Sequence, residues 1–155
     1  MKLRSAFACA LVGTMVIGMA ACDDDEGPDP ERFQATLTGG AEVPAVTTTA
    51  TGSALVEFTT TGLNYTVNVT GIQNVTLAHI HGPATTGQNA GVILNLNPNT
   101  SITTGVLASG TATQTNSQTV SMDSLKALIR AGLTYVNVHN TANQGGHIRG
   151  QLTAQ

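Results

Sequence analysis

Cysteine, tryptophan and charged side chains are all scarce in this 155-residue sequence. Tryptophan is absent, and only two cysteines occur, Cys9 and Cys22. Cys9 lies inside an N-terminal apolar segment with the features of a cleaved signal, so the mature chain would keep Cys22 alone. A mature chain of this kind has no disulfide and no cysteine available as a metal ligand, and its stability must come from packing.

Charge is nearly absent from the main body of the chain. Charged residues make up 10% of the sequence, and the formal net charge is −3. Residues 33–155 contain only six charged side chains, which balance to zero: Glu42, Glu57, Asp123, Lys126, Arg130 and Arg149. Since they form no basic patch, nucleic acid is not an expected partner.

Residues 1–21 have the pattern of a secretory signal. Lys2 and Arg4 precede an apolar run that is shorter than the roughly 20 residues of a membrane-spanning helix. The run ends in Met19–Cys22, which resembles a bacterial lipobox. We therefore expect a lipid on Cys22 that anchors the protein to a membrane of the bacterial cell envelope, in the periplasm or at the surface. The alternative is an ordinary signal peptide that leaves Cys22 as a free thiol.

Residues 22–32 predict a disordered tether. The stretch "DDDEGPDPE" is acidic and almost free of apolar side chains, so it cannot bury enough surface to offset the entropy of ordering. Fully extended, the tether spans up to roughly 30 Å. Residues 33–155 then form one domain.

Short β-prone runs separated by turn residues fill most of that domain, a pattern typical of a β-sandwich or barrel. The clearest is "LNYTVNVTG", in which alternate residues are apolar from Leu63 to Val69. One segment differs: Met122, Leu125, Leu128 and Ile129 recur at helical spacing. It predicts a single short helix over residues 122–131, with Ser121 as N-cap and Gly132 just beyond its end.

Three segments of the chain resemble the CHRD domain, a family named for chordin and common in bacterial envelope proteins. They are "FQATLTGGAEVP", "AHIHGPATTGQNAGVIL" and "AGLTYVNVHNTANQGGHIRGQL", in the family's order. The chain departs from the family pattern at Ala45, where a second proline is frequent, and at His147, where glutamate is common. The resemblance implies an antiparallel, Greek-key-like β-sandwich of the immunoglobulin or superoxide-dismutase type, and it implies little about activity.

The four histidines form two pairs. His79 and His81 alternate along one predicted strand, so both rings point to the same side. The runs "TYVNVHN" and "HIRGQLTA" predict a β-hairpin that places His139 opposite His147, with Cβ atoms about 4.5–5.5 Å apart. We expect His139 and His147 on polar faces that are accessible to solvent or a ligand. If the pairs converge, three or four imidazoles surround one point.

A cluster of imidazoles suits a transition metal, here copper or zinc. Metal binding requires neutral rings, so we expect the affinity to fall as the pH drops through the ordinary imidazole pKa of about 6.5. We interpret the protein as a binding module rather than an enzyme, since no acidic residue lies near a histidine in sequence to act as a general acid or base. Two alternatives stay open: a protein- or glycan-interaction module with structural histidines and no metal, and a metalloenzyme similar to superoxide dismutase.

Glu42 and Arg149 are conspicuous charges in a neutral domain. A buried charge needs a partner, so we expect the two side chains to form an ion pair that ties the first strand to the last.

The lipid anchor is directly testable. A Cys22→Ser chain cannot be acylated at that position, so it should leave the membrane fraction that holds the wild-type protein. Fractionation of cells followed by immunoblotting measures this. Unchanged membrane association of the variant would show that Cys22 is not the anchor.

Overall fold

The computed structural model describes residues 29–155, so the predicted signal segment, Cys22 and most of the predicted tether lie outside it. The described chain contains nine strands, one α-helix and one 3-10 helix. In order these are β1 (Arg32–Thr38), η1 (Gly39–Ala41), β2 (Thr51–Phe58), β3 (Leu63–Thr70), β4 (Val75–His81), β5 (Val92–Asn95), β6 (Gly105–Ala112), α1 (Met122–Arg130), β7 (Tyr135–Asn140), β8 (Ile148–Gln151) and β9 (Thr153–Ala154).

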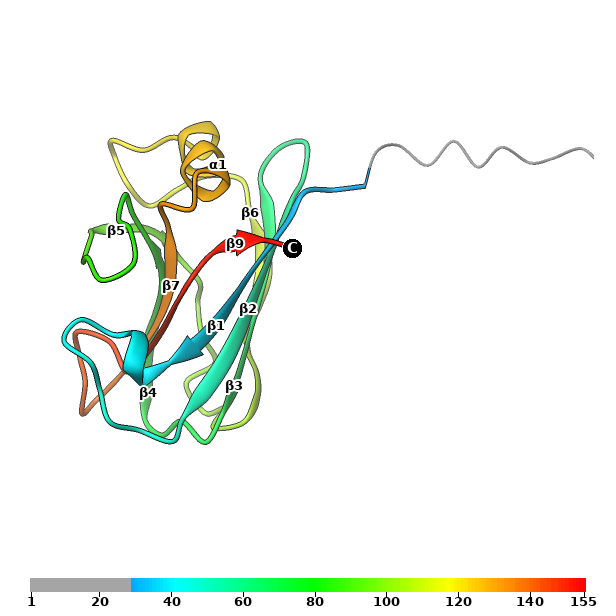
Figure 1. Ribbon diagram of the computed structural model, residues 1–155. Helices are drawn as coiled ribbons and strands as arrows, with labels where there is room; N and C mark the ends of the chain where they lie inside the picture. Colours follow the sequence, from blue (N-terminus) through cyan, green and yellow to red (C-terminus); the bar gives the residue numbers. More distant parts are fainter. Residues whose placement is uncertain (1–28) are drawn as a thin grey trace, which may run out of the picture.

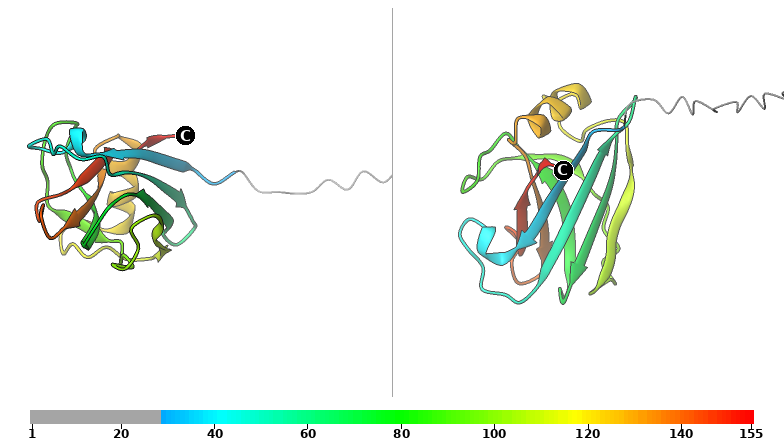
Figure 2. Two further views of the ribbon diagram at one scale, coloured as in Figure 1. Left: turned by 90° about the horizontal axis from the view of Figure 1, so that it is seen from below. Right: turned by 45° about the vertical axis from the view of Figure 1, so that its right-hand side comes forward.

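The strands form one antiparallel sheet that curls strongly into a half-barrel (Figures 1 and 2). Its order is β5-β4-β7-β8-β1-β2-β3-β6, and β9 pairs only with β1. The prediction of a mostly β fold with one short helix is confirmed, but the two-sheet sandwich is wrong. The sheet is continuous because β8 pairs with β1, through Thr38 and Arg149.

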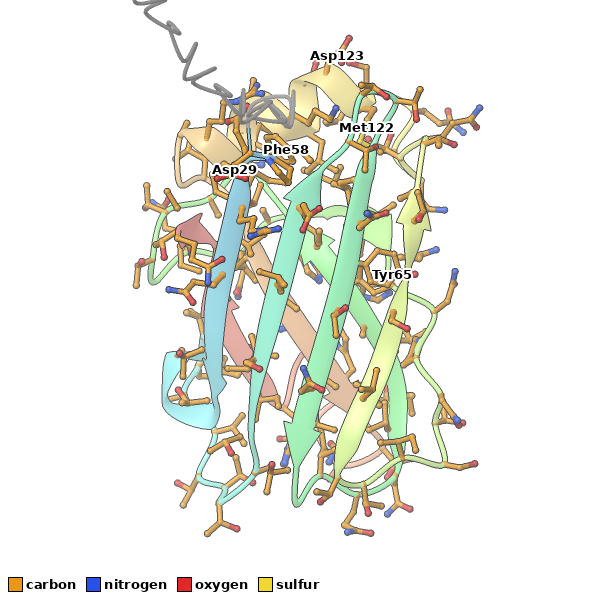
Figure 3. The ribbon with its side chains drawn as sticks, turned by 90° about the vertical axis from the view of Figure 1, so that its right-hand side faces the viewer. Asp29, Phe58, Tyr65, Met122 and Asp123 are labelled. Atoms are coloured by element: carbon orange, nitrogen blue, oxygen red, sulfur yellow. The ribbon has the colours of Figure 1, made fainter. Side chains whose placement is uncertain are left out.

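Alternation of side chains explains which face of the sheet is buried. In β3, Leu63, Tyr65, Val67 and Val69 are buried while Asn64 and Asn68 are exposed. The inward residues of the other strands extend this core inside the curl. Strands β1, β2, β3 and β6 lie side by side in Figure 3, which labels Tyr65 of β3.

Helix α1 lies across one end of the half-barrel, and local signals define both of its ends (Figure 1). Ser121 Oγ accepts a hydrogen bond from Ser124 N, as an N-cap does. At the other end Gly132 has φ +67°, and its N–H and that of Leu133 bond back to the carbonyls of Ile129 and Leu128. This arrangement is a Schellman motif, and it stops the helix where the sequence predicts. No helix within residues 29–155 is long and apolar enough to cross a membrane.

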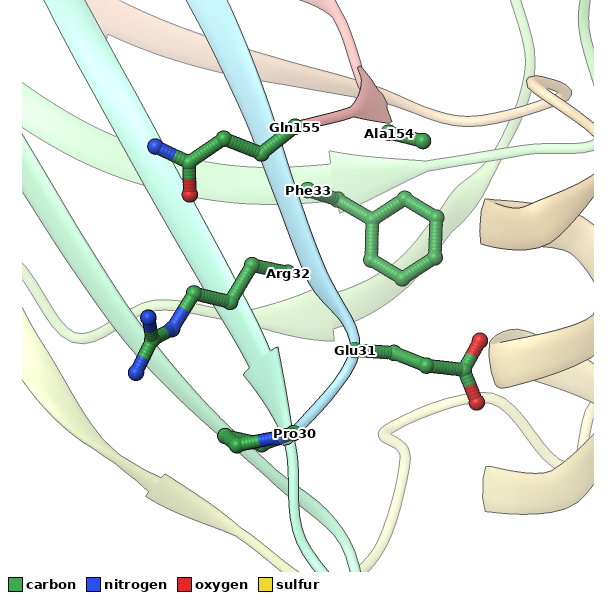
Figure 4. Close-up of a pocket in the computed structure, with 6 residues that line it drawn as sticks. All are labelled: Pro30, Glu31, Arg32, Phe33, Ala154 and Gln155. Carbon is green, nitrogen blue, oxygen red and sulfur yellow. The ribbon is translucent and has the colours of Figure 1, made fainter. Parts of the chain in front are cut away.

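The first described residues are tied to this helix. Arg130 donates two hydrogen bonds to Glu31, at 2.6 and 2.7 Å. Glu31 points toward the helix in Figure 4, while Arg32 points to the opposite side. Phe33 packs against Phe58 with ring centroids 4.8 Å apart, and Lys126 and Arg130 of the helix lie over the Phe58 ring. The chain therefore enters β1 at the end of the half-barrel that carries α1.

Strands β4 and β7 are buried on both faces over most of their length. All six residues of β7 are buried, as are the last four residues of β4. One face, with Ile80, Val136 and Val138, belongs to the core. The opposite face carries polar side chains and is contacted by the segments 39–50, 82–91 and 141–147. The candidate site lies on this polar face, in the part that the three segments largely shield from water.

The junction between β1 and β8 depends on the absence of a side chain at residue 150. A Cβ atom at Gly150 would overlap the carbonyl oxygen of Thr36 and touch the side chain of Leu37. Gly150→Ala should therefore destabilise the fold by at least about 2 kcal/mol in urea unfolding. Gly40→Ala is the control, since a Cβ there meets nothing within 4 Å. Equal stability of the two variants would show that β1 and β8 are not packed this closely.

Candidate metal site

Three of the four histidines meet on the polar face of β4 and β7. His79 and His81 come from β4 and His139 from β7, where the register pairs Leu77 with His139 and His79 with Asn137. One ring nitrogen from each histidine lies within 4.8 Å of the other two. His79 Nδ1 and His139 Nε2 are 3.1 Å apart. Two ligand atoms of a tetrahedral ion with bonds of about 2.0–2.1 Å are separated by about 3.3 Å, so the rings lie close to a ligating arrangement.

The three rings are buried, and the expectation that His139 lies on an accessible face is wrong. His79, His81 and His139 are 7%, 8% and 6% exposed. Loops cover this face and bury the rings. Alternation along a strand predicts which side chains share a face, but it does not predict whether another segment covers that face. Buried polar groups need partners in the protein or in a ligand.

Backbone carbonyls fix the tautomers of two of the rings. His81 Nδ1 lies 3.0 Å from Ala90 O, and His139 Nδ1 lies 2.8 Å from Gln144 O. A carbonyl oxygen only accepts, so Nδ1 of each neutral ring carries the proton and Nε2 keeps its lone pair. Metal-ligating histidines are held in this way, with the second nitrogen donating to a carbonyl or carboxylate.

His81 Nε2 is buried and has no hydrogen-bond partner in the described chain. A buried acceptor without a donor costs about 1–3 kcal/mol. A metal ion would engage this lone pair together with that of His139, while His79 would contribute Nδ1 after moving its proton to Nε2. The residues present therefore fit a transition metal held by three neutral imidazoles.

Burial also makes these rings weak bases. Desolvation lowers the pKa of His79 to about 4, helped by the neighbouring His139 and His81. Desolvation lowers the pKa of His81 to about 4 as well, against the opposing effect of its bond to Ala90. The pKa of His139 is lowered for the same reason. Protons therefore compete with a metal for His79 and His81 near pH 4 rather than near pH 6.5, so the pH at which affinity is lost is lower than the sequence predicts.

His147 lies outside this cluster. The β7–β8 register pairs Val138 with Ile148, which is the alignment that the predicted hairpin requires. His147 itself lies one residue before the start of β8. Its Nε2 lies 3.0 Å from Thr48 Oγ1, and its Nδ1 lies 2.9 Å from Asn143 Nδ2. Both ring nitrogens are thus engaged by loop side chains, and we leave His147 out of the candidate site.

Glu42 and Arg149 are both buried, but the expected ion pair between them is not among those formed within residues 29–155. Both carboxyl oxygens of Glu42 accept hydrogen bonds from Asn137 Nδ2, at 3.0 and 3.1 Å. Burial raises the pKa of Glu42 to about 7, and the charge of Arg149 opposes this rise. The two groups therefore interact only at longer range, because Asn137 satisfies the carboxyl group.

Arg149 holds the loop that covers the histidines. Its guanidinium group donates to Gln88 O at 2.6 Å and to Asn89 Oδ1 at 3.0 Å. It also lies over the ring of Tyr135, with Cζ 3.3 Å from the ring centroid. Tyr135 in turn stacks on His81 at 4.9 Å, with an angle of 2° between the rings. One layered stack therefore buttresses both His81 and the 82–91 loop.

Sequence reasoning found the histidines but assigned no role to Asn137 or Tyr135. Both alternate with His139 on β7, so their position on its face was readable from the sequence. The carbonyl groups of Ala90 and Gln144 carry no such signal, since any residue supplies a carbonyl.

A sequence model of the CHRD domain matches residues 33–152. Comparison with curated proteins found no match, and neither did comparison with solved structures.

The shifted pKa values predict how the stability of the metal-free protein depends on pH. In the folded protein His79 and His81 have pKa values below the ordinary 6.5. Their contribution to the free energy of unfolding is therefore present above pH 6.5 and is lost as the pH falls through about 4. Glu42 acts oppositely: its contribution is present below pH 4.5 and is lost as the pH rises through about 7. Acidification from pH 7 to 4 should therefore destabilise the Glu42→Gln variant more than the wild type.

Urea unfolding of both proteins at several pH values measures the difference, which is of the order of 3 kcal/mol, as expected for a shift of this size. A wild-type stability that falls as steeply as that of the variant would contradict the raised pKa of the buried Glu42.

Proposed function

The chain belongs to the CHRD domain family, and we propose that it is a metal-binding module that holds one copper or zinc ion between His79, His81 and His139. One observation carries the proposal: three buried ring nitrogens within 4.8 Å of one another, with Nδ1 of two rings already engaged by backbone carbonyls. A purely structural cluster leaves the buried Nε2 of His81 without a partner, whereas a bound ion would engage it.

The donor set supports copper or zinc. Neutral imidazole suits both metals, and the general order of affinities for divalent ions favours Cu(II). Hard ions such as Mg²⁺ and Ca²⁺ prefer oxygen ligands, which this cluster of histidines does not supply. Because the rings are buried, the proposal is binding rather than turnover of a substrate.

We further propose that the module works at the bacterial cell envelope, held by a lipid on Cys22. The supporting features are the lipobox-like end of the apolar segment and the acidic stretch after it. A tether of this kind would join the domain at Glu31, beside helix α1 and Arg130. The neutral, Thr- and Asn-rich surface leaves room for a protein or glycan partner, a second role that the metal site does not require.

Metal titration tests the proposal. Wild-type protein freed of metal should bind about one Cu(II) or Zn(II) per chain and gain about 2.7 kcal/mol of stability at a hundredfold excess of metal over the dissociation constant. The gain should persist at pH 5, because the pKa values of His79 and His81 are about 4 and burial lowers the pKa of His139 as well. Calorimetric titration and thermal melts measure the two quantities.

A variant of the fourth histidine provides the control. His79→Ala/His81→Ala should abolish binding, whereas His147→Ala should keep it, since His147 bonds Thr48 and Asn143 instead. If the double variant binds metal as the wild type does, or if the wild type binds none, the cluster is structural.

A further inference from the structure

Three buried side-chain atoms within residues 29–155 have no hydrogen-bond partner, and two of them belong to the face that carries the histidines. These two are His81 Nε2 and Asn137 Oδ1; the third is Thr134 Oγ1. Buried polar atoms of a folded protein are nearly always satisfied, so an unsatisfied pair on one face calls for an explanation, and a bound ligand supplies one.

Asn137 stands among the three histidines. It lies directly opposite His79 in the β4–β7 register, and the flanking pairs are Leu77 with His139 and His81 with Tyr135. Opposed residues on antiparallel strands share a face, with Cβ atoms about 4.5–5.5 Å apart. The cross-strand pair of His79 and Asn137 therefore lies between the pair that contains His81 and the pair that contains His139. It is 2% exposed.

Glu42 fixes the orientation of the Asn137 amide. Its two carboxyl oxygens engage Asn137 Nδ2, at 3.0 and 3.1 Å. Gly146 makes room for this contact, because a Cβ atom there would overlap both the amide nitrogen and the carboxyl group. With the nitrogen end held by Glu42, the oxygen end is the one without a partner.

We propose that Asn137 Oδ1 is the fourth ligand of the metal ion, and that the site is closed to outside ligands. This inference rests on the proposed metal-binding function. An amide oxygen only accepts, and a carboxyl group behind the amide nitrogen polarises it toward greater electron density on Oδ1. The carbonyl oxygens of Ala90 and Gln144 act in the same way, since they accept hydrogen bonds from Nδ1 of His81 and of His139. His81, His139 and Asn137 thus each donate a hydrogen bond to an acceptor on the side away from the proposed ion.

Closure follows from burial. Four protein ligands complete the tetrahedral coordination of a structural metal site, whereas a catalytic site keeps one position for water or substrate. The two unpartnered atoms have no contact with solvent, and residues 82–91 and 141–147 contact the ligands on this face. The protein therefore holds its ion rather than presenting it to a small molecule.

Visible spectroscopy of the Co(II)-loaded protein, with azide as the competing ligand, tests the inference. Wild-type protein should show the intense bands of four-coordinate Co(II), and excess azide should leave them unchanged. Asn137→Leu keeps the size of the side chain but removes the oxygen, so it should bind Co(II) at least about tenfold more weakly and respond to azide.

In the Glu42→Gln/Asn137→Asp double variant the amide is at position 42 and the carboxylate at position 137, so the hydrogen bond between them runs in the opposite direction. Position 137 still offers an oxygen as a metal ligand. It should bind Co(II) at least as tightly as wild type and exclude azide. This variant and the wild-type azide response decide the matter even if Asn137→Leu does not fold.

Two results would overturn the closed site: wild-type bands that change with azide, or an Asn137→Leu protein with wild-type affinity and spectrum. Either leaves the three-histidine site standing. A wild-type protein that binds neither Co(II) nor Cu(II) nor Zn(II) overturns the metal-binding function as well.

Discussion

Burial of both faces of β4 and β7 is the constraint on which the candidate site depends. One face contributes Ile80, Val136 and Val138 to the core, while loops cover the other. Water has little access to the polar side chains of the covered face, so these side chains need partners inside the protein. Most do, through Glu42, Ala90 and Gln144. The atoms left over are the nitrogen and oxygen that a metal ion would take.

The same burial sets the chemistry of the cluster. Desolvation keeps the pKa values of His79 and His81 near 4, so the rings are ready to bind a metal at neutral and mildly acidic pH. Burial also raises the pKa of Glu42 to about 7, which limits the cost of ionising a carboxyl group that is 6% exposed. Arg149 and Tyr135 add rigidity from the side of the 82–91 loop. Such a site suits retention of an ion at the cell envelope, the setting we propose.

Local patterns in the sequence predict the elements well and their assembly less well. The caps of helix α1, at Ser121 and Gly132, and the alternation of β3 are short-range properties, and the structure has them as predicted. Pairing of β8 with β1 is long-range, and an apolar alternation looks the same in a sandwich and in one curled sheet. For the site, strand periodicity brings His79, His81 and His139 together, but burial and the carbonyl partners depend on loops whose paths no periodicity encodes.

The most direct measurement is anomalous X-ray diffraction from crystals of the protein grown with Cu(II) or Zn(II). We expect a single strong anomalous peak on the covered face of β4 and β7, at about 2.0–2.1 Å from one nitrogen each of His79, His81 and His139. A peak at His147 instead, or none at any histidine in crystals that contain the metal, would contradict the three-histidine site.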